Sequence, residues 1–260
     1  MAYENIRVEV GERIATVTIQ RPKVLNALND ATLRELAHAF DDLRENDDVG
    51  LLILTGAGDK AFVAGADINE LAQMQAMEAK SKAFFGQQVF ARFENLGKPS
   101  IAMINGFALG GGCELALACT LRTASSTARL GLPEVSLGII PGYGGTQRLS
   151  RIAGPGVARE WVLTGDMFSA EEAWRVGVVN RMFAPEELVA GTRKLMATIL
   201  SRSPVAVRLG METIARGFNM TQQEGEVIES DMFGLASTTD DMHEGMAAFL
   251  EKRKPDFKGR

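Results

Sequence analysis

The stretch IAMINGFALGGGCELALAC, residues 101–119, decides the fold class of this chain. It begins with four apolar residues, 101–104, a continuous run typical of a strand that is buried on both faces. Three glycines, 110–112, then form a turn into a segment whose composition favours a helix. Residues 51–56, LLILTG, predict a second buried strand that a turn closes. This order of strand, glycine-rich loop and helix predicts an α/β fold.

The flanking regions add a hairpin at the start and helices at the end. Apolar residues alternate over 6–10 and again over 14–19, which predicts two paired strands. Apolar residues at helical spacing follow the candidate cap Asn29 over 33–43. From about residue 145 the pattern is mainly helical, with cap signals at Ser169 and at Ser203-Pro204. No linker composition separates the two halves.

Composition limits the class of protein. The chain has 260 residues and a net charge of −5, and it is 46% apolar, which fits one large domain or a domain with an appendage. The negative charge argues against nucleic acid as the main partner, because phosphate binding needs a basic field. The two cysteines, Cys113 and Cys119, give no metal or disulfide spacing and predict small buried residues in a reducing compartment. With no signal-peptide pattern and no apolar run near about 18 residues, we expect a soluble cytoplasmic protein.

Two segments of small residues are candidate donor loops: residues 64–67, AGAD, and the three glycines 110–112. Small side chains leave backbone N–H groups accessible, and a helix start leaves its first N–H groups without partners inside the helix. Two such donors could hold a carbonyl oxygen as it gains negative charge. The alternative for either loop is simple close packing. Neither 106–112 nor 142–145 fits the dinucleotide pattern G-x-G-x-x-G.

Two carboxylates follow glycine-rich or apolar segments. Glu114 comes directly after the three glycines and Cys113, and Glu134 follows Pro133 in an otherwise apolar stretch. Neighbouring carboxylates resist ionising together, so such a pair can supply one base and one acid. Glu114 could instead be a partner of the helix dipole, and Glu134 an exposed loop residue. The two histidines, His38 and His243, fit surface or packing roles.

Several segments together resemble the enoyl-CoA hydratase, or crotonase, family over essentially the whole chain. They are RPKVLNAL at 21–28, AFVAGADI at 61–68, NGFALGGGCEL at 105–115, PE at 133–134, IPGYGGTQRL at 140–149 and FLEKRKP at 249–255. The resemblance implies a spiral of strand–strand–helix repeats over residues 1–197 and a helical C-terminal region over 198–260 that trimerises. A homotrimer or homohexamer is then expected, with an acyl-CoA thioester as substrate.

The resemblance also implies roles for four residues. The N–H groups of Ala66 and Gly111 would form the oxyanion hole for the thioester carbonyl. Glu114 would hold the water and Glu134 would supply the proton at C2, which gives a 3-hydroxyacyl-CoA in fatty acid or related acyl-CoA metabolism. No metal and no cofactor are implied beyond the coenzyme A that the substrate carries.

Further residues would contact the substrate by resemblance. Gly142 would lie near the catalytic water, and a loop would lie against coenzyme A, with two lysines, one of them from a neighbouring subunit, near its phosphates. The loop residues are Ala64, Asp67, Ile68 and Asn69, and the lysines are Lys60 and Lys252.

The chain departs from the family pattern at a few positions. Asn69 stands where a Lys is frequent, and Thr120 stands where an Asp is frequent. Leu130 and Leu132 stand where Phe and Gln are common, and Tyr143 stands where a small residue is common. Apart from Thr120, which we do not interpret, these departures affect the phosphate contact and the acyl chain rather than the reaction. An enoyl-CoA isomerase, another crotonase-family enzyme or a non-enzymatic scaffold are the alternatives. The presence of both glutamates favours the hydratase.

Overall fold

The computed structural model describes residues 3–260, and its largest element is a six-stranded sheet with the order β1-β2-β3-β5-β7-β10. The strands β1 (Ile6–Gly11) and β2 (Ile14–Ile19) form the predicted antiparallel hairpin, with Ile6 opposite Ile19. The other pairings are parallel and join β2, β3 (Leu51–Gly56), β5 (Ser100–Ile104), β7 (Leu121–Ser125) and β10 (Arg181–Phe183). Every residue of β3 and β5 is buried, as their continuous apolar runs predicted.

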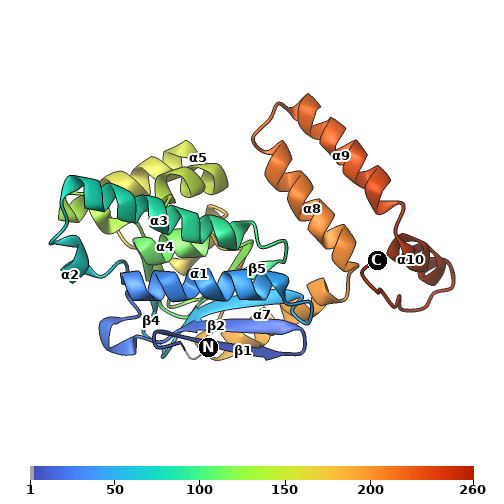
Figure 1. Ribbon diagram of the computed structural model, residues 1–260, viewed down its shortest axis with the longest axis horizontal. Helices are drawn as coiled ribbons and strands as arrows, with labels where there is room; N and C mark the ends of the chain where they lie inside the picture. Colours follow the sequence, from blue (N-terminus) through green and yellow to red (C-terminus); the bar gives the residue numbers. More distant parts are fainter. Residues whose placement is uncertain (1–2) are drawn as a thin grey trace. The chain divides into compact units, whose positions relative to one another are not determined.

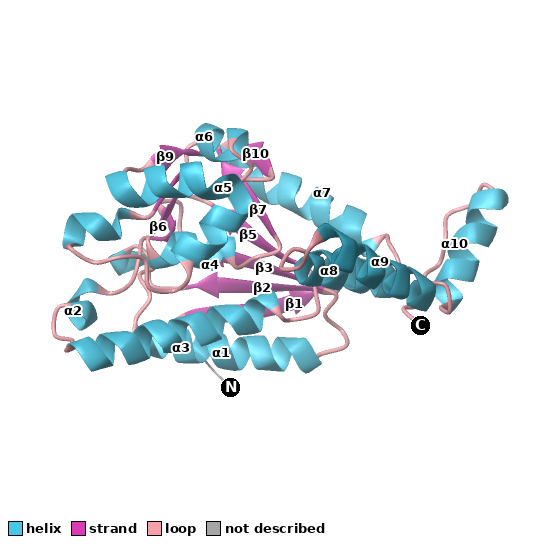
Figure 2. Cartoon of the chain, turned by 90° about the horizontal axis from the view of Figure 1, so that it is seen from above, coloured by secondary structure: helices cyan, strands magenta, loops and turns pink. Residues whose placement is uncertain are grey.

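A second, four-stranded sheet has the order β4-β6-β8-β9. Its strands are β4 (Ala61–Val63), β6 (Phe107–Leu109), β8 (Arg129–Gly131) and β9 (Phe168–Ser169). Along the chain, β3, β5 and β7 of the large sheet are each followed by one strand of the small sheet, β4, β6 and β8, and then by a helix. This repeat of strand, strand and helix confirms the predicted spiral architecture (Figure 2). The short strands β9 and β10 were missed, because two or three residues are too few for an alternating pattern.

Helices cover the sheets of this first unit, which comprises the chain up to Leu96 together with Ser100–Thr192 (Figure 1). The helix α1 (Asp30–Glu45) starts at the predicted cap Asn29, whose side chain accepts a hydrogen bond from the Thr32 N–H. It packs beside α3 (Ala76–Glu94) through Phe40 and Phe93, whose ring centroids are 4.4 Å apart. The remaining helices are α2 (Ile68–Leu71), α4 (Gly111–Leu117), α5 (Gly145–Thr164) and α6 (Ala170–Arg175), with 3₁₀ turns η1 (Pro22–Val24), η2 (Pro133–Leu137) and η3 (Pro185–Glu187).

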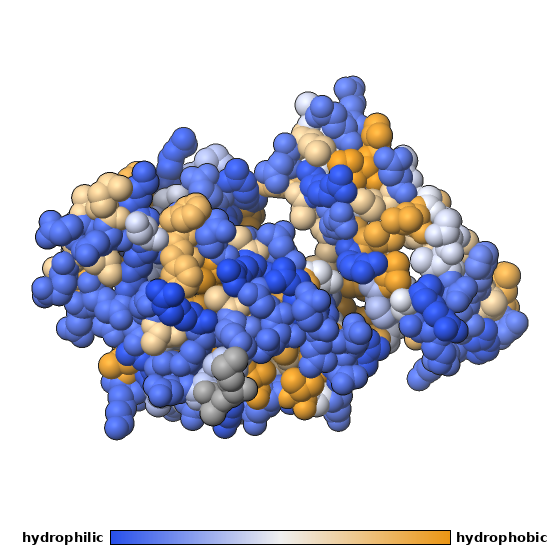
Figure 3. Space-filling model, viewed as in Figure 1, coloured by the Kyte–Doolittle hydropathy of each residue, from blue (hydrophilic) through white to orange (hydrophobic). Residues whose placement is uncertain are grey.

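The second unit comprises Gly97–Pro99 and Arg193–Arg260 and is helical. The helix α7 (Leu188–Leu200) leads into it, and α8 (Pro204–Gly217), α9 (Gln222–Ala236) and α10 (Asp240–Leu250) follow. The side chains of Ser203, Thr221 and Thr239 cap the last three helices. Large apolar side chains on these helices are exposed, and Figure 3 shows hydrophobic residues on their visible face. None of the helices within residues 3–260 is long and apolar enough to cross a membrane.

Candidate active site

A pocket of about 770 Å³ opens in the first unit. Its walls come from residues 64–74, the first half of α3, residues 109–114 at the start of α4, and residues 133–143. The two glycine-rich segments and the two glutamates singled out in the sequence all contribute to this lining. Segments distant in sequence therefore meet at one site.

The turn between β6 and α4 exposes backbone donors to the pocket. Gly110 adopts φ +50° and ψ −124°, a conformation that side-chain-bearing residues rarely take. A Cβ on Gly112 would lie 2.0 Å from the Val63 carbonyl oxygen, so only hydrogen fits there. The first hydrogen bond of α4 runs from the Glu114 N–H to the Gly110 carbonyl. The Gly111 N–H precedes this bond and is free of the helix ladder.

The second donor loop pairs with residues 25–28 through an isolated parallel bridge between Leu28 and Ala66. The Leu28 N–H donates to the Gly65 carbonyl oxygen at 2.9 Å, and the Asp67 N–H donates to the Leu28 carbonyl oxygen at 2.8 Å. The two hydrogen bonds of this bridge use the residues on either side of Ala66, so the Ala66 N–H between them faces away from Leu28. A Cβ placed on Gly111 would lie 3.6 Å from the Ala66 nitrogen. The two donor loops therefore come together at one point.

A buried asparagine in the RPKVLNAL segment supports this loop, a role that the sequence did not reveal. Asn26 has φ +60°, which Asn tolerates better than most residues. Its side chain accepts from the Arg21 N–H at 3.0 Å and donates to the carbonyl oxygens of Ala57 and Ala61 at 3.0 and 2.8 Å. The Ala64 N–H in turn donates to the Leu25 carbonyl oxygen at 3.0 Å. Asn26 thereby ties the donor loop to β4.

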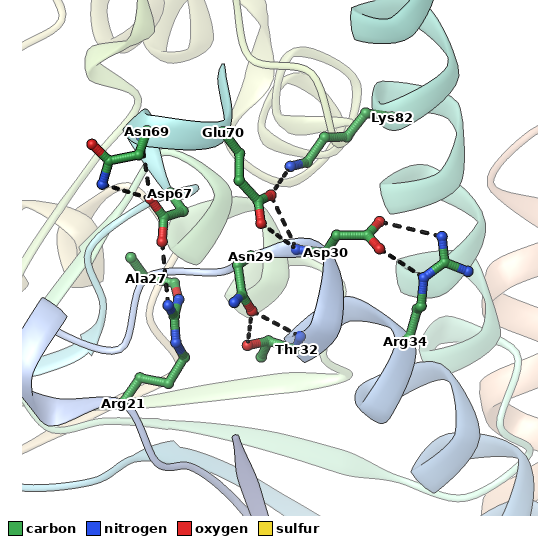
Figure 4. Close-up of polar contacts among 10 residues, drawn as sticks. All are labelled: Arg21, Ala27, Asn29, Asp30, Thr32, Arg34, Asp67, Asn69, Glu70 and Lys82. Atoms are coloured by element: carbon green, nitrogen blue, oxygen red, sulfur yellow. Dashed lines mark hydrogen bonds and ion pairs between the residues drawn. The ribbon is translucent and has the colours of Figure 1, made fainter. Parts of the chain in front are cut away.

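Two ion pairs anchor the segment that follows the donor loop (Figure 4). Asp67 accepts from the Arg21 guanidinium at 3.2 Å and caps α2 by accepting from the Asn69 N–H. Glu70 pairs with Lys82 of α3, and its carboxylate also accepts from the Asp30 N–H at the start of α1 at 3.1 Å. Helices α1, α2 and α3 are thus joined beside the pocket.

Glu114 lies in the first turn of α4 and is 1% exposed. Its Oε1 accepts hydrogen bonds from the N–H groups of Tyr143 and Gly145 at 2.8 and 2.7 Å. Burial, followed by the negative charge of Glu134, raises the pKa of Glu114 to about 7, and the two N–H donors oppose that rise. A buried carboxyl group with its pKa near neutrality can act as a base at pH 7.

Glu134 lies in η2, directly after Pro133, and is 9% exposed. A Cβ on Gly110 would lie 2.9 Å from the Glu134 Oε1, which places this carboxyl group at the start of the donor turn. Its Oε2 is buried and has no hydrogen-bond partner among residues 3–260. Burial raises the pKa of Glu134 to about 7. The alternative of an exposed loop residue is wrong, because Glu134 and the preceding residues 130–132 are buried.

Comparison with known proteins agrees with this geometry. Residues 9–260 match the enoyl-CoA hydratase/isomerase family. The chain belongs to the enoyl-CoA hydratase/isomerase family.

Relatives and solved structures cover the chain nearly from end to end. The chain is 50% identical to a crotonyl-CoA hydratase of Syntrophomonas wolfei over 257 residues, 99% of each chain. It is 46% identical to a short-chain-enoyl-CoA hydratase of Clostridium acetobutylicum, over all of both chains. The crystal structure of an enoyl-CoA hydratase from Bacillus anthracis superimposes with a TM-score of 0.95 at 39% identity, covering 99% of this chain and 100% of the other. These findings confirm the predicted family and its fold.

The other predicted binding residues divide into two groups. Ala64, Ile68 and Gly142 line the pocket of this hydratase/isomerase-family chain. Four do not: Asp67 and Asn69 bond to each other, Lys60 is exposed, and Lys252 belongs to the second unit, directly after α10. Across residues 3–260, no group of three or more His, Cys, Asp or Glu side chains could hold a metal ion.

The structure adds pocket residues that the sequence did not reveal. Lys80 and Lys82 of α3 line the pocket. Gln87, also of α3, donates to the Gly142 carbonyl oxygen at 2.9 Å, and Arg148 donates to the Tyr143 carbonyl oxygen at 2.6 Å. Polar residues of helices are usually solvated, so their spacing carried no signal of these contacts.

Proposed function

We propose that this chain is an enoyl-CoA hydratase, which adds water across the 2,3 double bond of a 2-enoyl-CoA and forms a 3-hydroxyacyl-CoA. The observation that carries the proposal is a pair of buried glutamates, each with a pKa raised to about 7, beside two converging backbone donors. Acid–base chemistry and carbonyl activation are both needed for this reaction, and one pocket supplies both.

The N–H groups of Ala66 and Gly111 bind the thioester carbonyl oxygen. As water adds at C3, negative charge moves through C2 onto this oxygen, and the two donors stabilise it. Their separate loops are held by the Leu28 and Gly110 contacts, so the donors need no reorganisation during the reaction. The removal of one such donor typically lowers a rate by roughly 10²- to 10³-fold.

The two glutamates divide the proton transfers. Glu114 enters as the carboxylate, because the Tyr143 and Gly145 N–H groups stabilise its charged form. Its carboxylate takes a proton from the water whose oxygen bonds to C3. Glu134 enters as the neutral acid and gives its proton to C2. As the resemblance to hydratases implies, hydroxyl and proton arrive on the same face, which is syn addition. The protein gains one proton and loses one.

The remaining parts of the proposal concern the rest of the substrate and the assembly. The 64–69 segment lies against coenzyme A, with Lys60 and a neighbouring subunit's copy of Lys252 near its phosphates. No metal and no further cofactor take part. The free, buried Cys113 and Cys119 support a cytoplasmic location.

A homotrimer or homohexamer completes the proposal. Exposed apolar side chains on α8 to α10 support it, among them Ile214, Phe218, Phe233 and Phe249, which are 61% to 81% exposed. Light scattering should give three or six times the mass of one chain. A monomer at micromolar concentration would refute this part alone.

The test of the activity is hydration of crotonyl-CoA, followed as the loss of the enoyl thioester absorbance. We expect saturable loss of absorbance and a 3-hydroxybutyryl-CoA product. Trans-3-hexenoyl-CoA is the matched control, because its conversion to the 2-enoyl isomer would gain the same absorbance. Isomerisation without hydration would assign the site to the isomerase branch, and neither reaction would refute the proposal.

A further inference from the structure

The ring of Tyr143 occupies the space between α3 and the donor turn. A Cβ on Gly86 of α3 would lie 2.3 Å from the Cδ1 atom of the ring, and a Cβ on Gly111 would lie 3.3 Å from its Cδ2 atom. One edge of the ring therefore contacts α3 and the opposite edge contacts the residue whose N–H belongs to the oxyanion hole. The side chain lines the pocket and is 5% exposed.

The ring is held in place from several directions. Gly86 lies inside α3, where glycine disfavours a helix, and the Tyr143 ring fills the place of the missing side chain. Phe90, one helical turn further along, meets the ring edge to face with centroids 5.5 Å apart. The backbone of Tyr143 is bonded on both sides, by its N–H to Glu114 and by its carbonyl oxygen to Arg148. The ring is thus a wall of the site and not a mobile side chain.

The hydroxyl group of Tyr143 adds no directional contact. It is buried and has no hydrogen-bond partner among the described residues 3–260. Burial, and then the negative charge of Glu114, raises the pKa of Tyr143 above its usual range, so the phenol stays neutral. The shape of the ring, and not its acidity, is what the site uses.

We propose that the Tyr143 ring ends the acyl side of the pocket and restricts the substrate to short 2-enoyl groups. The inference rests on the proposed function, which sets the thioester carbonyl at Ala66 and Gly111 and the double bond beside Glu114. Carbons beyond C4 must then pass the space between Gly86 and Gly111, which the ring fills. Longer chains are excluded by this wall, since a packed interior yields little to a bulky group.

A competing path for the acyl chain is visible in the same pocket. Leu137 and Ile140 line it and are 58% and 70% exposed. A chain that turned along these two residues would bypass Tyr143 and would bury further methylene groups. Each buried methylene improves binding by roughly fourfold, from about 0.8 kcal/mol. The two paths therefore predict opposite dependences of affinity on chain length.

The experiment measures the Kd of the saturated thioesters butyryl-CoA and octanoyl-CoA by titration calorimetry. Saturated chains bind without being hydrated, so the measurement does not depend on turnover. For the unaltered chain we expect octanoyl-CoA to bind no more tightly than butyryl-CoA. In Tyr143→Ala we expect the preference for octanoyl-CoA to rise at least tenfold, and in Tyr143→Leu by a smaller factor. Tyr143→Phe, the matched control that keeps the ring, should retain the original ratio.

Two results would refute the proposal that the Tyr143 ring limits the acyl chain length. One is a tenfold or greater preference of the unaltered chain for octanoyl-CoA, and the other is an unchanged ratio of the two Kd values in a folded Tyr143→Ala. Should Tyr143→Ala fail to show a cooperative thermal transition, the ratio in Tyr143→Leu decides. Crotonyl-CoA hydration is measured in parallel. The absence of hydration would refute the proposed function, and the ratios of the Kd values would still decide whether the Tyr143 ring limits the acyl chain length.

Discussion

The first turn of α4 and the 3₁₀ turn η2 each carry one buried glutamate, but the hydrogen bonds to the two carboxyl groups differ. Glu114 in α4 is bonded twice through one oxygen, by the N–H groups of Tyr143 and Gly145. Glu134 in η2 has a buried Oε2 without a partner among residues 3–260. Both are at most 9% exposed, and burial raises both pKa values to about 7.

This difference in hydrogen bonding indicates which carboxyl group holds the proton in the proposed reaction. Burial disfavours the charged form of both carboxyl groups, and the repulsion between two carboxylates keeps the groups from ionising together. Two N–H donors favour the charged form of Glu114, whereas Glu134 has one backbone hydrogen bond, from its own N–H, and its Oε2 has no partner among residues 3–260. In the proposed reaction, this difference in hydrogen bonding assigns the base to Glu114 and the acid to Glu134.

The largest expected effect is on the rate of hydration, when either the proposed base or the proposed acid is removed. Glu114→Gln loses the base and Glu134→Gln loses the acid, and each should lower kcat for crotonyl-CoA hydration by roughly 10²- to 10⁴-fold. Gln preserves the volume, and its carbonyl oxygen can still accept from the Tyr143 and Gly145 N–H groups. The measurement is a steady-state assay of both variants with the exposed-site control Glu186→Gln, which should keep the full rate.

An undiminished rate in either variant would refute the division into base and acid, because the two glutamates would then not share the proton transfers. The mass of the assembly by light scattering accompanies the assay. A loss of activity that came with a changed mass would count as a folding defect, and the corresponding Asp variants would then decide.

The sequence predicted the parts of the site that are local and missed those that depend on tertiary contacts. The three glycines and Glu114 stand together in the chain, so a donor turn followed by a carboxylate was visible. The 64–67 loop and Glu134 were also candidates from the residues, and the family resemblance gave Ala66 and Glu134 their roles. The contact of Asn26 with Ala61 and that of Gln87 with Gly142 join residues that are 35 and 55 positions apart. No periodicity reports such pairs.

The fold shows the same division. Continuous apolar runs predicted β3 and β5, and a cap residue predicted α1, because each of these signals lies within a few residues. The pairing of β4, β6 and β8 into a second sheet depends on three-residue strands, and only the family resemblance announced that arrangement. The meeting of Tyr143 with Gly86 was invisible for the same reason.

A smaller effect is expected on stability. Each glutamate has a folded pKa of about 7, above the unfolded value of about 4.3. For a carboxyl group with a raised pKa, folding favours the protonated form, so its contribution is complete below about pH 4.3 and is lost as the pH rises through 7. Above pH 7 a buried charge then costs up to about 4 kcal/mol.

Glu114→Gln should therefore raise the free energy of unfolding by up to about 4 kcal/mol at pH 8 and by little at pH 4. Urea unfolding at the two pH values measures the difference, with Glu186→Gln as the exposed control that should change neither. Equal effects at both pH values would mean that packing, and not the charge, sets the difference. The pKa of Glu114 in α4 would then not be raised by folding.

The smallest and sharpest effect concerns the pH profile. The active form needs Glu114 ionised and Glu134 protonated, so kcat/KM for crotonyl-CoA should fall on both sides of a maximum near pH 7. Below the maximum Glu114 takes up a proton, and above it Glu134 loses one. In Glu134→Gln the alkaline fall should disappear, because the group that causes it is gone. The acid fall should stay in place, because Glu134 is protonated and uncharged in the pH range where Glu114 takes up its proton. An alkaline fall that persists in Glu134→Gln would place the acid elsewhere, and an acid fall that moves to lower pH would show that Glu134 is already ionised where Glu114 takes up its proton.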